Sequence, residues 1–202
     1  MGQLTRGTHQ VGAFAAALGA LAFLGPAALG SDPVRSVLDL VGISAARPPV
    51  GWPSLAGFFV CALLGGTAPD LDKPRQFWAR ALAHTAFGGH RHLSHSLVGL
   101  ILASAVVGLL LGQLGRATGI ALALPFLGFM AGYVSHLVLD SLTIEGVPWL
   151  FPLPAYLGVP PWSGLRVRTG HLVEQLLVMP ALLGLIGWLG YRGGDALAAW
   201  WK

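Results

Sequence analysis

The chain has 202 residues, of which 54% are hydrophobic and only 10% are charged, and its mean hydropathy is +0.69. A soluble domain carries about 25% charged residues, so this composition excludes an ordinary soluble protein and indicates an integral membrane protein. The formal net charge of +4 comes without any run of Lys and Arg, which argues against nucleic-acid binding and fits contact with anionic lipid headgroups.

Five apolar segments are long enough to cross a bilayer as helices, which takes about 17–25 residues. They cover residues 11–30, 52–69, 95–114, 119–140 and 172–191. The sequence therefore predicts an all-α fold: a polytopic membrane helix bundle with about five transmembrane helices and interfacial loop segments. We interpret residues 1–202 as a single integral-membrane domain. The segments are rich in Gly and Ala, and small-residue spacings such as Gly128 with Gly132 favour close helix packing.

The connecting segments carry patterns of their own. Residues 31–50 contain Val34, Val37 and Leu38 at helical spacing, which predicts a short interfacial helix. A short turn is expected at residues 115–118. Residues 147–162 contain too many prolines for a helix, and their Trp and Tyr side chains suit the boundary between water and lipid. We expect this segment to lie along the membrane surface, or to dip inward where protein shields its backbone.

Potential metal ligands gather on one side of the predicted bundle. When the five spans are drawn across a bilayer, all seven histidines fall on the side of the N-terminus. Five of the eight carboxylates fall there too, namely Asp70, Asp72, Asp140, Glu145 and Glu174. Scattered polar residues would divide between the two faces, so this gathering predicts a metal site at one mouth of the bundle. Seven of the twelve Lys and Arg residues also lie on this side, which places it in the cytoplasm by the positive-inside tendency.

The second span ends in the sequence Pro-Asp-Leu-Asp, with Asp70 and Asp72 two residues apart. Two carboxylates this close at a membrane boundary repel each other, and a divalent cation bound between them removes the repulsion. The alternative is a solvated helix end whose Asp side chains face water.

Three histidines, His90, His92 and His95, lie within six residues just before and at the start of the third span. Neutral imidazole is the commonest protein metal ligand, so this cluster favours a metal site over a pH-sensitive interfacial loop. Ser94 is expected to cap the N-terminus of the third span.

The fourth span carries His136 and Asp140 on one helix face, because they are four residues apart. Ionisable residues in a spanning helix are usually functional, although a His–Asp pair can also simply pack the bundle. Glu174 lies one turn into the fifth span, where an unpaired charge is costly. Glu174 could ligate metal, act as a general base, pair with Arg166 or Arg168, or favour the positive end of the helix.

The order of these motifs resembles the YdjM-type family of bacterial and archaeal inner-membrane proteins, which are predicted to be metal-dependent hydrolases. The motifs are TH (8–9), PDLD (69–72), GHRHLSHS (89–96), GYVSHLVLDSLTIEGVPWLFP (132–152) and RTGHLVE (168–174). Their arrangement is also distantly similar to that of bacterial zinc-dependent phospholipases C. Matching motif to motif implies metal ligands at His9, Asp70, Asp72, His90, His95, His136, Asp140 and Glu174. His92 departs from the family pattern, in which Gly usually follows His-Arg.

The function expected from these observations is a membrane-bound metal-dependent hydrolase with one or two divalent ions, most readily Zn or Mn. We expect metal-activated water to attack a phosphoester or similar bond of an anionic lipid or lipid-linked substrate. Arg91 would hold the anionic group, and Glu174 or Asp72 would be the general base. The alternatives are a divalent-metal transporter and a membrane scaffold with a structural metal. The absence of a His-Glu-x-x-His motif disfavours a zincin-type protease.

Overall fold

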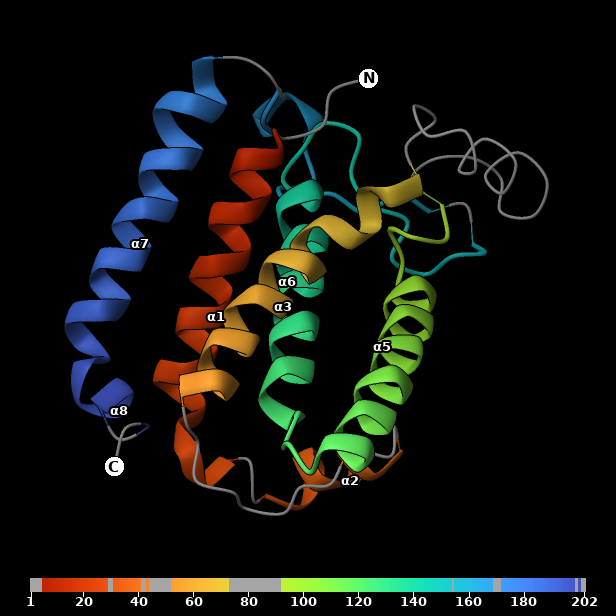
Figure 1. Ribbon diagram of the computed structural model, residues 1–202. Helices are drawn as coiled ribbons and strands as arrows, with labels where there is room; N and C mark the ends of the chain where they lie inside the picture. Colours follow the sequence, from red (N-terminus) through yellow and green to blue (C-terminus); the bar gives the residue numbers. More distant parts are fainter. Residues whose placement is uncertain are drawn as a thin grey trace.

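The computed structural model describes residues 5–28, 31–40, 43, 52–72, 92–153, 155–168, 172–198 and 200. This part of the chain is helical apart from two isolated β-bridges and connecting segments. The long helices are α1 (Arg6–Ala28), α3 (Trp52–Thr67), α5 (Leu97–Thr118), α6 (Ala123–Ser141) and α7 (Met179–Arg192). The short elements are α2 (Asp32–Leu40), η1 (Ala68–Asp72), η2 (Ser163–Leu165), η3 (Glu174–Val178) and α8 (Gly194–Ala198). The long helices form a bundle (Figure 1), which confirms the predicted all-α membrane fold.

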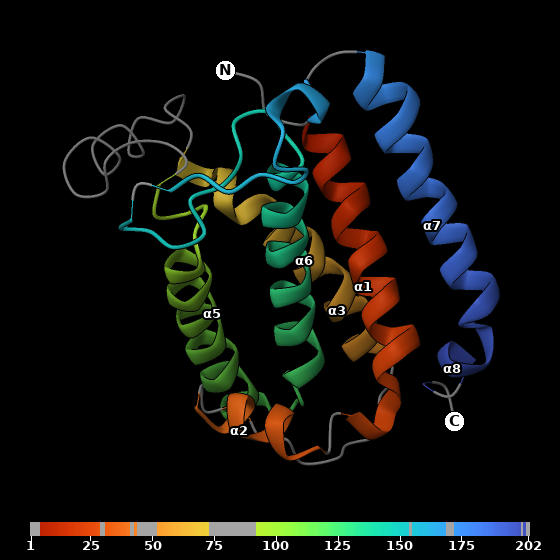
Figure 2. The ribbon, with the colours of Figure 1, turned by 180° about the vertical axis from the view of Figure 1, so that it is seen from behind.

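Four of the expected spans appear as helical segments that are long and apolar enough to cross a membrane. These segments are Pro53–Leu71, Leu97–Thr118, Ala123–Ser141 and Glu174–Arg192. The remaining expected span corresponds to α1, whose 23 residues extend for about 34 Å, the length that a spanning helix needs. Figure 2 shows α1 between α6 and α7, in line with the rest of the bundle. The described helices therefore agree approximately with the predicted five.

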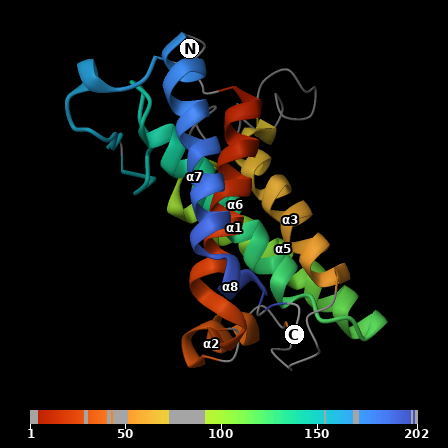
Figure 3. The same ribbon diagram turned by 90° about the vertical axis from the view of Figure 1, so that its left-hand side faces the viewer.

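Helix α6 lies at the centre of the bundle, where it contacts α3, α1 and α5. Its spanning segment is 67% buried, whereas that of α7 is only 11% buried. Helix α7 packs mainly against α1 and is the outermost helix in Figure 1; in Figure 3 it faces the viewer, in front of α1. The residues of α6 are therefore the best shielded from lipid, and those of α7 are the least shielded.

Helices α3 and α6 touch backbone to backbone, because α6 presents glycines where they meet. A Cβ atom added to Gly132 would lie 1.9 Å from the carbonyl oxygen of Ala62, and one added to Gly128 would lie 2.2 Å from that of Phe58. No larger residue fits at either position without separating the helices. The spacing of Gly128 and Gly132 in the sequence therefore marks a real packing contact.

Helix α5 is shifted relative to the expected third span. Residues 115–118, which were expected to form a turn, are the last turn of α5, and the chain reverses at Gly119, whose φ is 71°. Glycine adopts this left-handed conformation without a steric penalty, so it ends the helix. At the other end, α5 begins at Leu97, and its N-cap is Ser96, whose side chain accepts a hydrogen bond from the backbone N–H of Gly99 (3.1 Å). The expectation that Ser94 caps this helix is therefore wrong.

Two connecting segments fold as their composition suggests. The predicted short helix in residues 31–50 is α2, which lies at the end of the bundle opposite the N-terminus and buries Leu38 (Figure 1). Residues 142–168, hereafter the interfacial segment, are largely non-helical and lie at the end of the bundle where the N-terminus is. There Trp149 donates a hydrogen bond to Ser141 Oγ (2.9 Å), and the Arg166 guanidinium donates to the Pro160 carbonyl (2.7 Å). These contacts satisfy backbone and side-chain polar groups that no helix would satisfy.

Candidate metal centre

Four elements meet at the N-terminal end of the bundle and bring together residues that are far apart in the sequence. They are the first turn of α1, η1, the residues just before α5 and the last turns of α6 (Figure 1). The side chains that they place there are His9, Asp70, His95, His136 and Asp140. All five are buried, with exposed fractions between 0% and 9%. Four of the five sequence motifs therefore each place at least one buried side chain in this cluster.

The carboxylate of Asp140 lies in the middle of this cluster. Its Oδ2 lies 3.5 Å from His95 Nε2 and 3.6 Å from His136 Nε2, and its Oδ1 lies 3.4 Å from His9 Nε2. Asp70 Oδ1 lies 3.8 Å from the Nε2 atoms of both His95 and His136, and these two nitrogens are 3.3 Å apart. Nitrogen and oxygen donors from three imidazoles and two carboxylates thus face one small volume.

The cluster contains two overlapping sets of three residues. Within each set, the three ligand atoms all lie within 4.8 Å of one another. One set is His9, Asp70 and His136, and the other is His95, His136 and Asp140. Burying two carboxylates side by side is unfavourable, because each loses its hydration and repels the other. A divalent cation offsets both effects and accepts the imidazole lone pairs, so this donor set fits one metal ion, or a close pair of which His136 ligates only one.

The environment of His9 fits metal binding better than packing alone. Its ring stacks on that of His136, with centroids 3.8 Å apart and an angle of 12° between the planes. Its Nε2, which faces the cluster, is buried and has no hydrogen-bond partner among the residues that the structure describes, because the 3.4 Å to Asp140 Oδ1 exceeds an ordinary hydrogen bond. A buried polar nitrogen of this kind usually has a partner, and a metal ion supplies one.

The two other imidazoles are oriented by contacts behind the site. His136 Nδ1 lies 2.7 Å from the carbonyl oxygen of Gly66, which can only accept, so Nδ1 carries the proton and Nε2 faces the cluster as an acceptor. His95 Nδ1 lies 2.9 Å from the hydroxyl of Ser94, and the Tyr133 hydroxyl donates to the Ser94 carbonyl. Metal-ligating histidines usually have such a partner on the second nitrogen. The hydrogen bond from His136 to Gly66 was not predicted from the sequence, because a backbone carbonyl has no side chain that would identify it as the partner of a metal ligand.

Glu174 lies beside the cluster and belongs to neither ligand set. Its buried Oε1 accepts hydrogen bonds from the backbone N–H of Thr5 and from the hydroxyl of Thr8, both at 2.6 Å. Thr8 directly precedes His9, so this carboxylate ties the start of the last span to the first turn of α1. These contacts give Glu174 a positioning role for His9, and its use as a ligand or general base stays a prediction.

Three of the predicted site residues cannot be placed in full. His90 and Arg91 lie outside the described residues, and Asp72 ends η1 with its side chain outside them. His92, which departs from the family pattern, has its Nε2 3.3 Å from the hydroxyl of Tyr156 and is absent from both ligand sets. The histidine-rich motif therefore contributes His95 to the cluster among its described residues.

Comparison with known proteins finds a family of inner membrane proteins whose model matches nearly the whole chain, and bacterial relatives that match part of it. The sequence model of a family described as "YdjM inner membrane protein" matches residues 4–201. The "Inner membrane protein YdjM" of Escherichia coli (strain K12) is 34% identical over 147 residues, which is 70% of each chain, and the protein of that name in Shigella flexneri matches equally well. The "Uncharacterized protein YvsG" of Bacillus subtilis (strain 168) is 29% identical over 90 residues, or 45% of this chain and 48% of the relative. No solved structure matches.

Proposed function

We propose that this chain, which belongs to the YdjM family of inner membrane proteins, is a metal-dependent hydrolase of a lipid or lipid-linked substrate. The observation that carries the proposal is the convergence of three imidazoles and two carboxylates from four separate elements in one buried volume. Packing does not require this arrangement, since one His–Asp pair satisfies itself and a second buried carboxylate only adds repulsion. Family membership and the apolar helices support a multi-pass protein of the inner membrane.

The metal would be held by the five buried side chains, namely His9, Asp70, His95, His136 and Asp140. Mixed imidazole and carboxylate ligation suits Zn or Mn, and the two overlapping sets leave room for one ion or two. When bound, the ion would supply a water made acidic enough to act as a nucleophile near neutral pH, and positive charge for an ester oxygen. The Gly66 carbonyl and the Ser94 hydroxyl would keep the imidazoles aimed at that ion.

Two further residues of the sequence motifs would bind the substrate and accept its proton. Arg91 would grip an anionic group, because a guanidinium matches the geometry of phosphate. Asp72 is the better candidate for general base, since Oε1 of Glu174 already accepts hydrogen bonds from Thr5 and Thr8. Asp70 is the most exposed of the five ligands, at 9%, so its side of the cluster is the side from which substrate would approach.

A lipid or lipid-linked substrate fits the surface next to the cluster. The interfacial segment exposes large apolar side chains at this end of the bundle, including Leu150, Leu153, Val159, Trp162 and Leu165. Exposed groups of this kind at the end of a membrane bundle are suited to the boundary between headgroups and acyl chains. We assign this end to the cytoplasmic face on the positive-inside tendency of seven basic residues against five.

Metal content and turnover measured together test the proposal. Protein purified from membranes should contain a transition metal by elemental analysis, and should hydrolyse phospholipid in mixed micelles in a metal-dependent way. His136→Ala should lose both metal and activity, because His136 belongs to both ligand sets. His92→Ala is the matched control and should keep both, because His92 contacts Tyr156 and lies outside the cluster.

The alternatives give different results in the same samples. Metal uptake into proteoliposomes without turnover of any phosphoester would support a divalent-metal transporter and overturn the hydrolase. Bound metal with neither transport nor turnover, together with unfolding of His136→Ala, would support a scaffold with a structural metal. Protein purified without metal, and unable to bind added Zn or Mn, would refute the site itself.

A further inference from the structure

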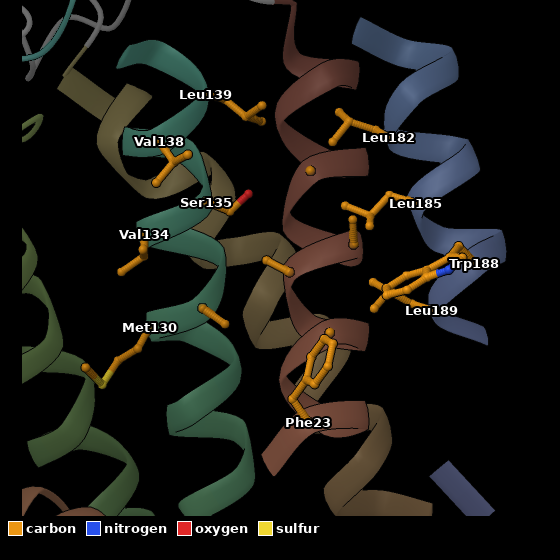
Figure 4. A pocket seen from close by; sticks show the side chains of 15 residues that line it. Phe23, Met130, Val134, Ser135, Val138, Leu139, Leu182, Leu185, Trp188 and Leu189 are labelled. Atoms are coloured by element: carbon orange, nitrogen blue, oxygen red, sulfur yellow. The ribbon is translucent and has the colours of Figure 1, made fainter. Parts of the chain in front are cut away.

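An apolar groove opens between α1, α6 and α7 within the membrane-spanning part of the bundle (Figure 4). Its volume is about 580 Å³, which lies in the range of pockets that bind small molecules. Of the fifteen residues that line it, only Ser135 has a hydroxyl or charged side chain. Helix α1 lines the groove with the small residues Gly12, Ala15, Ala16 and Gly19.

The groove lies next to the metal centre, because the same two helices build both. Leu139 lines the groove and directly precedes Asp140, and Gly12 lines it one turn after His9. Figure 4 shows Leu139 at one end of the groove and Phe23 at the other. One end of the groove therefore lies beside the residues that flank the cluster, and the groove extends from there along α1 into the membrane-spanning part of the bundle.

The length of the groove matches one leaflet of a bilayer. Along α6 it extends over the ten residues from Met130 to Leu139, or about 14 Å at the helical rise per residue. The hydrocarbon core of a bilayer is about 30 Å thick, so the groove covers close to half of it. A partner helix that crosses the bilayer would need a groove about 10 Å wide through the full thickness of the hydrocarbon core. A single hydrocarbon chain needs a groove that covers only one leaflet.

The groove is continuous with the surface that faces lipid. Helix α7 forms its outer wall, and two of the wall residues, Leu185 and Trp188, are 43% and 50% exposed. Phe23, which lines the far end on α1, is 75% exposed, so the groove is also open to the surface there. A lipid chain can thus enter from the bilayer without passing through water.

We infer that this groove binds a hydrocarbon chain of a membrane lipid from the leaflet that contains the metal centre, and so places the lipid headgroup at that centre. The assignment of this lipid as substrate rests on the proposed function, whereas chain binding needs neither metal nor turnover. Because the bilayer core is as apolar as the groove, binding depends on packing and not on the hydrophobic effect. We therefore expect selective occupancy that a bulky side chain in the groove abolishes.

Photolabelling of the full chain tests the inference. The probe is phosphatidylglycerol with a diazirine midway along one acyl chain, in phosphatidylcholine vesicles that contain the purified protein. Mass spectrometry should find label enriched severalfold in residues 12–23, 130–139 and 182–189 relative to the exposed face of α5. Ala16→Phe should lose this enrichment, because Ala16 lines the groove. Ala181→Phe, the same substitution at an exposed position of α7 outside the groove, should keep it.

Several results would overturn the inference. Equal labelling of α5 and the groove, or enrichment that survives Ala16→Phe, would mean that lipid only surrounds the bundle. Groove peptides that escape label in a protein that elutes as a dimer would mean that a second copy fills the groove. If Ala16→Phe fails to fold, Leu185→Trp narrows the groove from α7 and should give the same loss.

The outcome separates this inference from the proposed function. Ala16→Phe should retain the metal content of the wild-type protein, because Ala16 lies outside both ligand sets. Groove labelling should persist in His136→Ala, which lacks a metal ligand. Localised labelling in a protein without hydrolytic activity would contradict the proposed function and leave lipid binding in the groove supported. Metal-dependent hydrolysis with no localised labelling would contradict only the inference that the groove binds a lipid chain.

Discussion

Replacing Gly132 by Ala should damage the metal centre from a distance, through the packing of α3 against α6. The added Cβ would lie 1.9 Å from the carbonyl oxygen of Ala62 and 2.8 Å from the backbone nitrogen of Gly66. Both contacts are with backbone, which cannot rotate away as a side chain can. The two helices must therefore separate locally by about 1 Å, and overpacking of this kind costs about 1–3 kcal/mol.

The same displacement reaches the ligands, because Gly66 belongs to the contact. Its carbonyl accepts the hydrogen bond from His136 Nδ1 at 2.7 Å, and a shift of about 1 Å stretches this distance beyond the hydrogen-bonding range. Loss of a partner on the second nitrogen of a metal-ligating histidine typically lowers metal affinity by about 10- to 100-fold. Gly132→Ala should therefore lower both the melting temperature and the affinity for Zn or Mn.

Thermal unfolding in detergent, followed by Trp fluorescence, and metal titration of the chelated protein measure the two effects. Gly184→Ala is the matched control, since a Cβ at Gly184 of α7 would have nothing within 4 Å. It should leave affinity unchanged and stability unchanged or slightly raised, because Ala favours helix over Gly. A Gly132→Ala protein with wild-type affinity and melting temperature would refute the argument that this backbone contact positions the site.

Three further predictions concern the site itself. Asp140→Asn should leave a folded protein that has lost its metal, because Asp140 contacts all three imidazoles of the cluster. Stoichiometric metal in this variant by elemental analysis would contradict the role of Asp140 as a ligand. Removal of metal by a chelator should lower the melting temperature of the wild-type protein and not that of His136→Ala, since an ion that binds only the folded state stabilises it. Equal shifts of the melting temperature in both proteins would argue against the site. Thr8→Val removes a hydrogen bond to the buried Glu174 carboxylate and should cost about 1–3 kcal/mol of stability in thermal or denaturant unfolding, whereas Thr118→Val, at an exposed position, should have little effect.

The helices, and the end of the bundle at which the ligands gather, were predictable from the sequence alone. Apolar runs of spanning length are local features, and the alternation of spans across a bilayer assigns each motif to a side. The pairing of His136 with Asp140 was also readable, since residues four apart share a helix face. The helix ends were less accurate, because Gly119 and Ser96 compete with neighbouring residues that are equally plausible caps.

The tertiary structure alone decided which atoms meet. The contact of the Gly66 carbonyl with His136 and the anchoring of Glu174 by Thr8 join residues 70 and 166 positions apart. The groove is likewise lined by residues of α1, α6 and α7, which are far apart in the sequence. Such contacts depend on helix rotation and separation, which are set by the summed packing of many weak interactions along each interface. Sequence spacing predicts which residues share a helix face or an end of the bundle, and the packing of the helices determines which of them are in contact.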